Sequence, residues 1–325
     1  MVDVARRAEV SLKTVSRVIN DEPGVRPETA ARVRDAVKAL GYRANDIARN
    51  LRRGRPLATV GLVIEDVRNP FYSSMARSVE EVARQRGYMV ITASSDEDPG
   101  AERKAVGALL ERRVGGLLIV PAGRDHAYLL DEIRLGTPVV FMDRPAEGVE
   151  VDEILLDNVG GARRAVQHLL AQGHHRIGVV ADPPTIYTIS ERVSGYQATL
   201  EEAGIPIDED LLRVGAHDVR EAEAATRELL SLPDPPTAIF ATNNRVTIGA
   251  LHALRAGGAG VALVGFDDFE LADLVGVSVI RNSPREMGRR AAELLFSRLQ
   301  GDERPPQRIV LPTELVARGS GEVPR

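Results

Sequence analysis

The sequence predicts an α/β protein, with a small helical module at its amino end and a two-lobed domain of parallel sheets behind it. Two observations carry this prediction. Short amphipathic helices fill residues 1–43, and from residue 58 apolar strand-like runs alternate with helices. Continuous apolar strands separated by helices are typical of parallel sheets with right-handed crossovers. Ten or so strands are too many for one small sheet, so we expect two successive lobes.

The helical module at the amino end is built from three short segments. Residues 3–8 place small apolar residues at helical spacing, and Ser11 is a suitable N-cap for a second helix over Leu12–Ile19. Pro27 favours the start of a third helix, which runs to residue 40 and is stopped by Gly41. In that helix we expect one apolar face made of Ala30, Val33, Val37 and Leu40.

The segment over residues 45–56 differs from both neighbours. Asn45 and Asp46 can cap a helix over residues 47–51, which gives way to an Arg-rich stretch ending in Pro56. Such a short helix is not stable alone. We therefore expect a linker that folds only when something holds it.

From residue 58 onward, apolar runs typical of strands alternate with amphipathic segments typical of helices. We expect strands at residues 58–64, 88–93, 114–121, 138–143, 176–181, 238–242 and 261–266. The intervening helices are expected at residues 73–87, 101–112, 161–172, 192–203 and 247–256. Residues 307–319 read as a further extended passage, and the boundary between the lobes is expected near Asp157 and Asn158.

Charge is distributed unevenly along the chain. Residues 1–55 hold 13 Lys/Arg and 7 Asp/Glu, a net charge of +6, so the remainder carries −11 of the total of −5. A basic end on an acidic body suits a protein that places one end on nucleic-acid phosphates. Charge alone does not decide this, because an ordinary charged helix surface in contact with solvent would give the same distribution.

Bulk properties limit the cellular setting and the chemistry. The 325 residues, 43% hydrophobic and 27% charged, lie in the globular range. No apolar run is long enough to span a membrane, and Asp3, Arg6 and Arg7 interrupt any signal-peptide pattern. With no signal pattern and no Cys, we expect a cytoplasmic protein without a membrane partner. No cofactor and no metal are expected, because the adjacent His174 and His175 point apart and no third ligand is spaced nearby.

The first two helices have the pattern of a helix-turn-helix. Val4, Ala5 and Ala8 would pack inward, Val10 would fill the turn, and Val15, Val18 and Ile19 would anchor the second helix. This arrangement leaves four side chains projecting from the exposed side near the start of the second helix: Leu12, Lys13, Ser16 and Arg17.

The run from Val4-Ala5 through Val10-Ser11 to Thr14-Val15-Ser16-Arg17-Val18-Ile19-Asn20 resembles the signature of the lactose-repressor (LacI/GalR) family. Later segments match in order and spacing over nearly the whole chain, including Asn69-Pro70-Phe71-Tyr72 and Gly265-Phe266-Asp267-Asp268. The resemblance implies a helix-turn-helix domain over residues 1–44, a hinge helix over 45–56, and a periplasmic-binding-protein-like domain over 57–325. Its amino-side lobe would comprise residues 57–156 and 283–312, and its carboxyl-side lobe residues 157–282 and 313–325.

The resemblance also implies which residues contact DNA. Leu12 and Lys13 fall where the family reads bases, and Ser16 and Arg17 would support them in the groove and on phosphates. Thr14 suits a phosphate contact and Asn20 a helix end. In the hinge, Leu51 would insert into the minor groove as an apolar wedge, beside Asn45 and Ala48.

One position departs from the family pattern. Glu9 stands where the helix-turn-helix usually has Gly. If the backbone there is left-handed, a non-Gly residue costs on the order of 1 kcal/mol.

The resemblance places an effector between the lobes, at the carboxyl ends of the strands. Asp143, Arg192, Asn243 and Asp267 match positions that hold sugars or bases in relatives, and such side chains suit vicinal hydroxyls. Phe71 and Tyr72 would cover a ring, and Thr188, His217 and Asn282 are further candidates. Taken singly, each could instead cap a helix or lie on the surface. Ile186 stands where a purine-sensing relative has Arg, which favours a sugar-like ligand.

The implied function is a sequence-specific transcriptional regulator, a repressor, whose affinity for operator DNA is controlled by a small sugar-like effector. It would bind a pseudo-palindromic duplex as a homodimer, with dimer contacts that include the helix at residues 73–87. No nucleophile elbow, phosphate-binding Gly-Lys loop or His-Glu-x-x-His motif occurs, so no catalytic residue is expected. Two alternatives stay open: a sugar-binding protein with a protein-binding bundle, and a hydrolase or kinase on the same scaffold.

Overall fold

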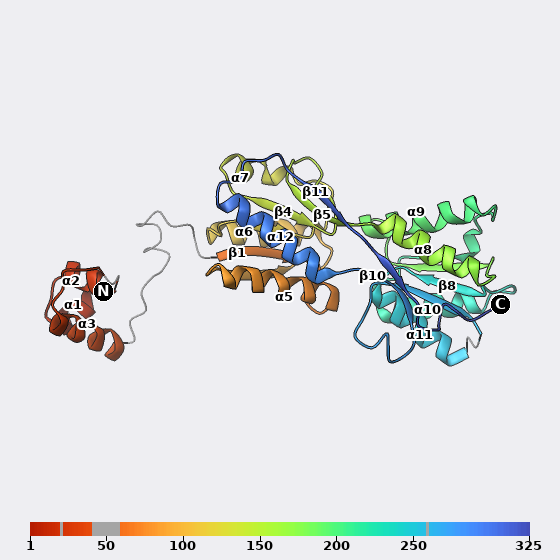
Figure 1. The fold of residues 1–325 in the computed structure, drawn as a ribbon, viewed down its shortest axis with the longest axis horizontal. Helices are drawn as coiled ribbons and strands as arrows, with labels where there is room; N and C mark the ends of the chain where they lie inside the picture. The colour runs from red at the N-terminus through yellow and green to blue at the C-terminus, as the bar shows by residue number, and fades with distance from the viewer. Residues whose placement is uncertain (20–21, 41–58, 258–259) are drawn as a thin grey trace. The chain divides into compact units, whose positions relative to one another are not determined.

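The computed structural model describes residues 1–19, 22–40, 59–257 and 260–325. The chain divides into two compact units, Met1–Leu57 and Ala58–Arg325, which are described separately here. Figure 1 shows the helices and strands of each unit. Residues 41–58, which include the predicted hinge helix with Asn45, Ala48 and Leu51, lie outside the described residues, as does Asn20.

The amino-terminal unit is a three-helix bundle of α1 (Val2–Ala8), α2 (Leu12–Ile19) and α3 (Pro27–Ala39). Ser11 caps α2 as predicted, since its Oγ accepts a hydrogen bond of 3.1 Å from the Thr14 amide. The inward packing predicted for the first two helices is confirmed, and α3 adds two residues to the same core. That core consists of Val4, Ala5, Ala8, Val15, Val18, Val33 and Ala36, with Val10 and Ile19 partly buried against it.

The predicted apolar face of the third helix is wrong at its end. Leu40 is 42% exposed, because α3 ends at Ala39 and Leu40 is its C-cap residue with φ −94° and ψ 0°. Ala36 takes the buried position one turn earlier. Once the helical backbone stops, the 3.6-residue period no longer places the next residue over the core.

The turn between α1 and α2 contains a left-handed residue. Glu9 has φ 55° and ψ 47°, and its amide donates to the carbonyl oxygens of the last turn of α1. This conformation is the one that the missing Gly would adopt without strain.

The amino-side lobe of the second unit contains a six-stranded sheet in the order β11-β5-β4-β3-β1-β2. All its pairings are parallel. Helices α5 and α12 cover one face and α6 covers the other, and buried residues of β1 alternate between these two layers. The elements are β1 (Thr59–Ile64), α5 (Pro70–Gln85), β2 (Met89–Ser94), α6 (Pro99–Glu111), β3 (Leu117–Ile119), η1 (Ala127–Leu129), α7 (Leu130–Arg134), β4 (Val139–Met142), β5 (Asp152–Leu156), α12 (Pro284–Leu299) and β11 (Arg308–Leu311).

The carboxyl-side lobe repeats this plan with the order β12-β10-β9-β8-β6-β7. Its pairings are parallel except at the edge, where β12 runs antiparallel to β10. Helices α8 and α9 pack on one face, and α10 and α11 on the other. The elements are α8 (Asn158–Ala171), β6 (Ile177–Ala181), α9 (Tyr187–Glu202), η2 (Glu209–Leu211), β7 (Leu212–Val214), α10 (Val219–Leu230), β8 (Ala238–Ala241), α11 (Asn244–Gly257), β9 (Ala262–Phe266), β10 (Ser278–Arg281) and β12 (Glu314–Val316).

The chain passes between the two sheets three times: from β5 to α8, from β10 to α12, and from β11 to β12. Figure 1 shows these crossings side by side between the lobes. In each sheet the strand order reverses at the first strand of the lobe, β1 or β6, and such a switch point leaves a crevice at the carboxyl ends of the strands. The predicted fold class is thus confirmed.

Several predicted element boundaries need correction. All five helices predicted in this unit begin two to five residues earlier than expected, at Pro70, Pro99, Asn158, Tyr187 and Asn244. In α5 and α6 the reason is that Asn69 and Asp98 are the caps and the following prolines occupy the first helical position. The sequence analysis also missed α7, α10 and α12, and it missed short strands of three to five residues. Such short strands carry too few residues for a periodicity to be recognised. No helix among the described residues is long and apolar enough to cross a membrane.

We predict that Glu9→Gly stabilises the helix-turn-helix by about 1 kcal/mol, because Gly removes the strain of the left-handed backbone. In the full-length protein, amide hydrogen exchange in α1 and α2 should slow about fivefold. The control is Glu28→Gly in the first turn of α3, where Gly weakens a helix and exchange should accelerate. Equal effects of the two substitutions would contradict the strain at Glu9.

Candidate functional site

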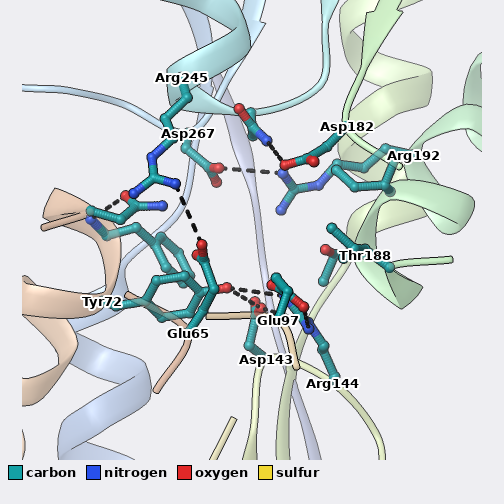
Figure 2. A pocket seen from close by; sticks show the side chains of 15 residues that line it. Glu65, Tyr72, Glu97, Asp143, Arg144, Asp182, Thr188, Arg192, Arg245 and Asp267 are labelled. Atoms are coloured by element: carbon teal, nitrogen blue, oxygen red, sulfur yellow. Dashed lines mark hydrogen bonds and ion pairs between the residues drawn. The ribbon is translucent and has the colours of Figure 1, made fainter. Parts of the chain in front are cut away.

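A cavity with an empty volume of about 430 Å³ lies between the two lobes. Its walls come from the ends of β1, β2, β4, β6, β8 and β9 and from the first turns of α5, α9 and α11 (Figure 2). The lining residues are Glu65, Asn69, Phe71, Tyr72, Glu97, Asp143, Arg144, Asp182, Ile186, Thr188, Ile189, Arg192, Asn243, Arg245 and Asp267.

Asp143 and Asp267 occupy equivalent positions in the two lobes. Each follows the fourth strand of its lobe along the chain, β4 or β9, which is third in the strand order of its sheet. Both have left-handed backbones, with φ 68° and φ 65°, and each amide donates to a carbonyl on the neighbouring strand, at Ile154 or Ile280. Strained non-Gly residues of this kind gather at functional sites. Here the strain turns a carboxylate from each lobe toward one cavity.

Arg192 is 3% exposed and joins the elements of the carboxyl-side lobe. Its Nη1 donates to the Thr242 carbonyl at 2.6 Å and contacts Asp267 Oδ2 at 3.3 Å. Its Nε donates to Asn158 Oδ1 at 2.9 Å, and its guanidinium lies 3.7 Å from the centre of the Phe266 ring. These contacts fix the position of the guanidinium at the cavity wall.

Asp182 is held between two partners. Its Oδ1 lies 2.9 Å from His217 Nδ1, and its Oδ2 accepts from the Asn243 amide at 2.9 Å. Burial of the imidazole opposes its protonation, but the hydrogen bond and charge of Asp182 outweigh this and raise the pKa of His217. His217 itself stands outside the lining and supports the carboxylate from behind.

The amino-side lobe contributes an aromatic wall. Phe71 and Tyr72 open α5, and their rings meet edge to face with centroids 5.0 Å apart. The Tyr72 hydroxyl donates to Asp143 Oδ2 at 3.4 Å and accepts from Arg144 Nη2 at 3.3 Å. Arg144 also forms a bidentate ion pair with Glu97, in which the Nη1–Oε2 bond is 2.6 Å. An apolar wall beside placed polar groups suits a small polar ligand with one flatter face.

Direct contacts close the cavity between the lobes. At the start of α11, Arg245 donates to Asp66 Oδ2 at 2.5 Å and lies 3.4 Å from Glu65 Oε1, while the Asn244 amide donates to Asn69 Oδ1 at 2.9 Å. Burial alone would raise the pKa of Asp66, but hydrogen bonds from Arg68 and Arg245 outweigh it and lower the pKa to about 2. We call the Arg245–Asp66 and Asn244–Asn69 contacts the latch. Because of the lowered pKa, Asp66 stays ionised in it at neutral pH.

Glu65 is the least well partnered carboxylate in this latch region. It is 6% exposed, and burial and the charge of Glu97 raise its pKa to about 7 against the weaker effect of Arg245. A carboxyl group in this state takes up or loses a proton easily near neutral pH.

Seven of the nine predicted effector-binding residues line the cavity: Phe71, Tyr72, Asp143, Thr188, Arg192, Asn243 and Asp267. The other two stand behind them, since His217 holds Asp182 and the Asn282 amide donates to Asp267 Oδ1 at 2.5 Å. The sequence analysis missed Glu65, Asn69, Glu97, Arg144, Asp182, Ile189 and Arg245. Glu65 and Asp182 directly follow strands β1 and β6, so the strand-end rule that found Asp143 could have found them too.

On α2 the predicted DNA-reading side chains are accessible to different degrees. Leu12 and Lys13 are exposed, whereas Thr14, Ser16 and Arg17 are half-buried. Val15 and Val18 face the bundle core. The helix therefore presents its first turn outward, as a recognition helix does when its amino end enters the major groove.

Comparisons with known proteins agree with this architecture. Residues 58–318 match the family described as periplasmic binding proteins and sugar binding domain of the LacI family, and residues 1–45 match bacterial regulatory proteins of the lacI family. The HTH-type transcriptional regulator CelR of Thermobifida fusca is 37% identical over 335 residues, covering 98% of this chain and 97% of that protein. DegA of Bacillus subtilis (strain 168), also a transcriptional regulator, is 31% identical and covers 98% and 96%.

Two solved structures are similar over 98% of both chains. The transcriptional regulator CelR–cellobiose complex is 33% identical with a TM-score of 0.73. The lac repressor dimer bound to operator and the anti-inducer ONPF is 26% identical with a TM-score of 0.82.

Fold and cavity together define a helix-turn-helix protein with a two-lobed, periplasmic-binding-protein-like domain. The chain belongs to the LacI family of bacterial regulatory proteins, as the sequence motifs predicted, and it is a DNA-binding transcriptional regulator.

We predict that Glu65→Gln stabilises the protein at alkaline pH. Because the folded-state pKa of about 7 is above the ordinary value of 4.5, the folded state binds more protons and wild-type stability falls as pH rises between these values. The substitution should therefore be close to neutral at pH 5 and raise the free energy of unfolding by on the order of 2–3 kcal/mol at pH 8.

Urea unfolding of the full-length protein at both pH values, followed by circular dichroism, measures this difference. Glu111→Gln, a matched change at the exposed end of α6, should show no such pH dependence. A constant difference across the pH range would contradict the raised pKa of Glu65.

Proposed function

We propose that this regulator represses transcription from a pseudo-palindromic operator, and that a small polyhydroxylated effector bound between the lobes changes its affinity for that DNA. The observation that carries the proposal is that the same chain contains a helix-turn-helix bundle and a polar cavity between two lobes. Relatives support it: one solved structure is a CelR–cellobiose complex, and another is a lac repressor dimer on operator DNA. We infer that the protein acts as a homodimer in the cytoplasm and has no enzymatic activity.

The functional division that we propose follows the predicted one. Residues 1–44 bind the major groove, residues 45–56 form a hinge in the minor groove with Leu51 as its wedge, and residues 57–325 bind effector and form the dimer. In the recognition helix, Lys13 reads a base and Leu12 contacts a thymine methyl or fills space. Thr14, Ser16, Arg17, Asn20, Asn45 and Ala48 supply the remaining contacts to groove and phosphates.

The effector would act by changing the relative stability of two arrangements of the lobes. A ligand can shift such an equilibrium only by as much as it binds one state better than the other. In the closed arrangement Asp143 and Asp267, one from each lobe, line the same cavity. A ligand can contact both carboxylates at once only when the lobes are closed. It therefore binds the closed arrangement more tightly and stabilises it.

Selection of duplexes from a random pool by the full-length, ligand-free protein tests the DNA-binding part. We expect a two-fold symmetric consensus, and Lys13→Ala should weaken binding by about 1–3 kcal/mol and relax specificity at the base that it reads. The control Lys104→Ala changes a Lys on α6, outside the recognition helix. Absence of any selected sequence would refute the proposal.

Arg192 tests the sensing part. For a sugar that raises the melting temperature of the full-length protein, Arg192→Ala should abolish the change in operator affinity that the sugar causes while leaving ligand-free DNA binding intact. Because removal of Arg192 leaves Asp267 without its cation, Asn243→Ala serves as a second, milder variant. Arg163→Ala, which removes a surface ion pair with Glu202, should respond as wild type. A full response in both cavity variants would place the effector elsewhere.

A further inference from the structure

The charges around the interlobe cavity do not balance. Five carboxylates line it, and three guanidiniums, those of Arg144, Arg192 and Arg245, stand against them. With all five ionised, the excess is two negative charges within a largely buried space, and the raised pKa of Glu65 lets a proton relieve part of it. A cation on a ligand would relieve it in the same way.

Each guanidinium is already engaged. Arg144 is bound bidentately by Glu97, and Arg245 makes its short bond to Asp66 rather than to a lining carboxylate. Arg192 is divided among Asp267, the Thr242 carbonyl and Asn158. The protein's own cations therefore leave some lining carboxylates with little compensation.

Glu65 and Asp143 are those carboxylates. Glu65 is reached only by Arg245, at 3.4 Å, among the hydrogen bonds between described residues. Asp143 is 2% exposed, and among the described residues its Oδ1 has no hydrogen-bond partner although its Oδ2 contacts Tyr72. A buried acceptor of this kind that borders a cavity indicates a donor on the ligand. Figure 2 shows both side chains on the amino-side wall of the cavity.

A metal ion does not fit this arrangement. Within the described part of the chain, no three acidic, His or Cys side chains converge closely enough to hold one. A protonated amine needs fewer acceptors, because it presents three donors from one small centre. The remaining lining groups, which include Thr188, Asn243 and the Phe71 ring, suit hydroxyls and one face of a ring.

We propose that the effector is an amino sugar or a similar polyhydroxylated ring, whose protonated amine is bound by Glu65 and Asp143. This inference rests on the proposed function of the same cavity and specifies the chemistry of its ligand. The amine supplies positive charge where the protein has none to spare, and the hydroxyls bind the groups of the carboxyl-side wall.

The test measures binding of matched ligand sets to the full-length protein by isothermal titration calorimetry at pH 7. The probes are glucosamine, galactosamine and mannosamine, each beside its parent hexose and its N-acetyl derivative, which has similar hydroxyls but no charge. We expect at least one hexosamine to bind about tenfold or more tightly than both of its neutral counterparts. A neutral sugar that binds as tightly as its amine, or no hexosamine binding up to about 10 mM, would overturn the proposal.

Glu65→Gln supplies the second arm, because the amide keeps the shape of the side chain and removes its charge. The variant should lose the preference for the amine, with hexosamine affinity falling about tenfold and hexose affinity changing less than about threefold. Glu111→Gln should keep the preference. An unchanged preference in Glu65→Gln would exclude Glu65 as the partner of the amine. The DNA selection is carried out without ligand, so failure here with a consensus intact removes the ligand class and leaves the proposed regulator standing.

Discussion

The structure of the sensing unit depends on the meeting of two parallel sheets at their carboxyl ends. Each lobe brings its loops, its helix amino ends and its left-handed Asp to that edge. Polar and charged side chains thus gather in the one place between the lobes where neither hydrophobic core can cover them. Their burial is acceptable only while each carboxylate finds a donor, so the cavity is both the proposed binding site and the place where the two lobes meet.

The repeated topology explains why the site has two matching halves. Asp143 and Asp267 come from equivalent strands, and each amide is held by the neighbouring strand in the same way. Their neighbours differ: the amino-side lobe pairs Arg144 with Glu97, whereas the carboxyl-side lobe sets Arg192 against the Phe266 ring. A ligand between them meets a carboxylate on both sides but a different surface on each. In the proposed function this asymmetry would fix the orientation of the ligand.

Closure depends on direct contacts between the lobes and, in the proposed function, on contacts to a ligand as well. Arg245 and Asn244 hold the lobes together without any ligand, through Asp66 and Asn69. A ligand that compensates Glu65 and Asp143 adds to these contacts. In the proposed function, the ligand would bind the closed lobes with a more favourable free energy than the open ones. That difference in binding free energy is the most that the ligand could use to change the state of the DNA-binding module.

Much of the fold and part of the candidate site could be predicted from the sequence, because they depend on patterns among neighbouring residues. The periodicity and the Ser11 cap identify the helix-turn-helix, and the alternation of apolar strands with helices identifies the parallel sheets. Seven of the predicted ligand residues line the cavity, because the carboxyl ends of the strands and the first turns of α5 and α9 converge there. The burial predicted for Leu40 was wrong, because α3 ends one residue before it. The short strands β5, β7 and β10 were missed, because they contain too few residues for a periodicity to be recognised. Only the tertiary structure decided that Glu65, Glu97 and Arg245 meet at the same cavity. Which charges are compensated is a property of distances between residues 35 to 180 positions apart, and no local pattern records them.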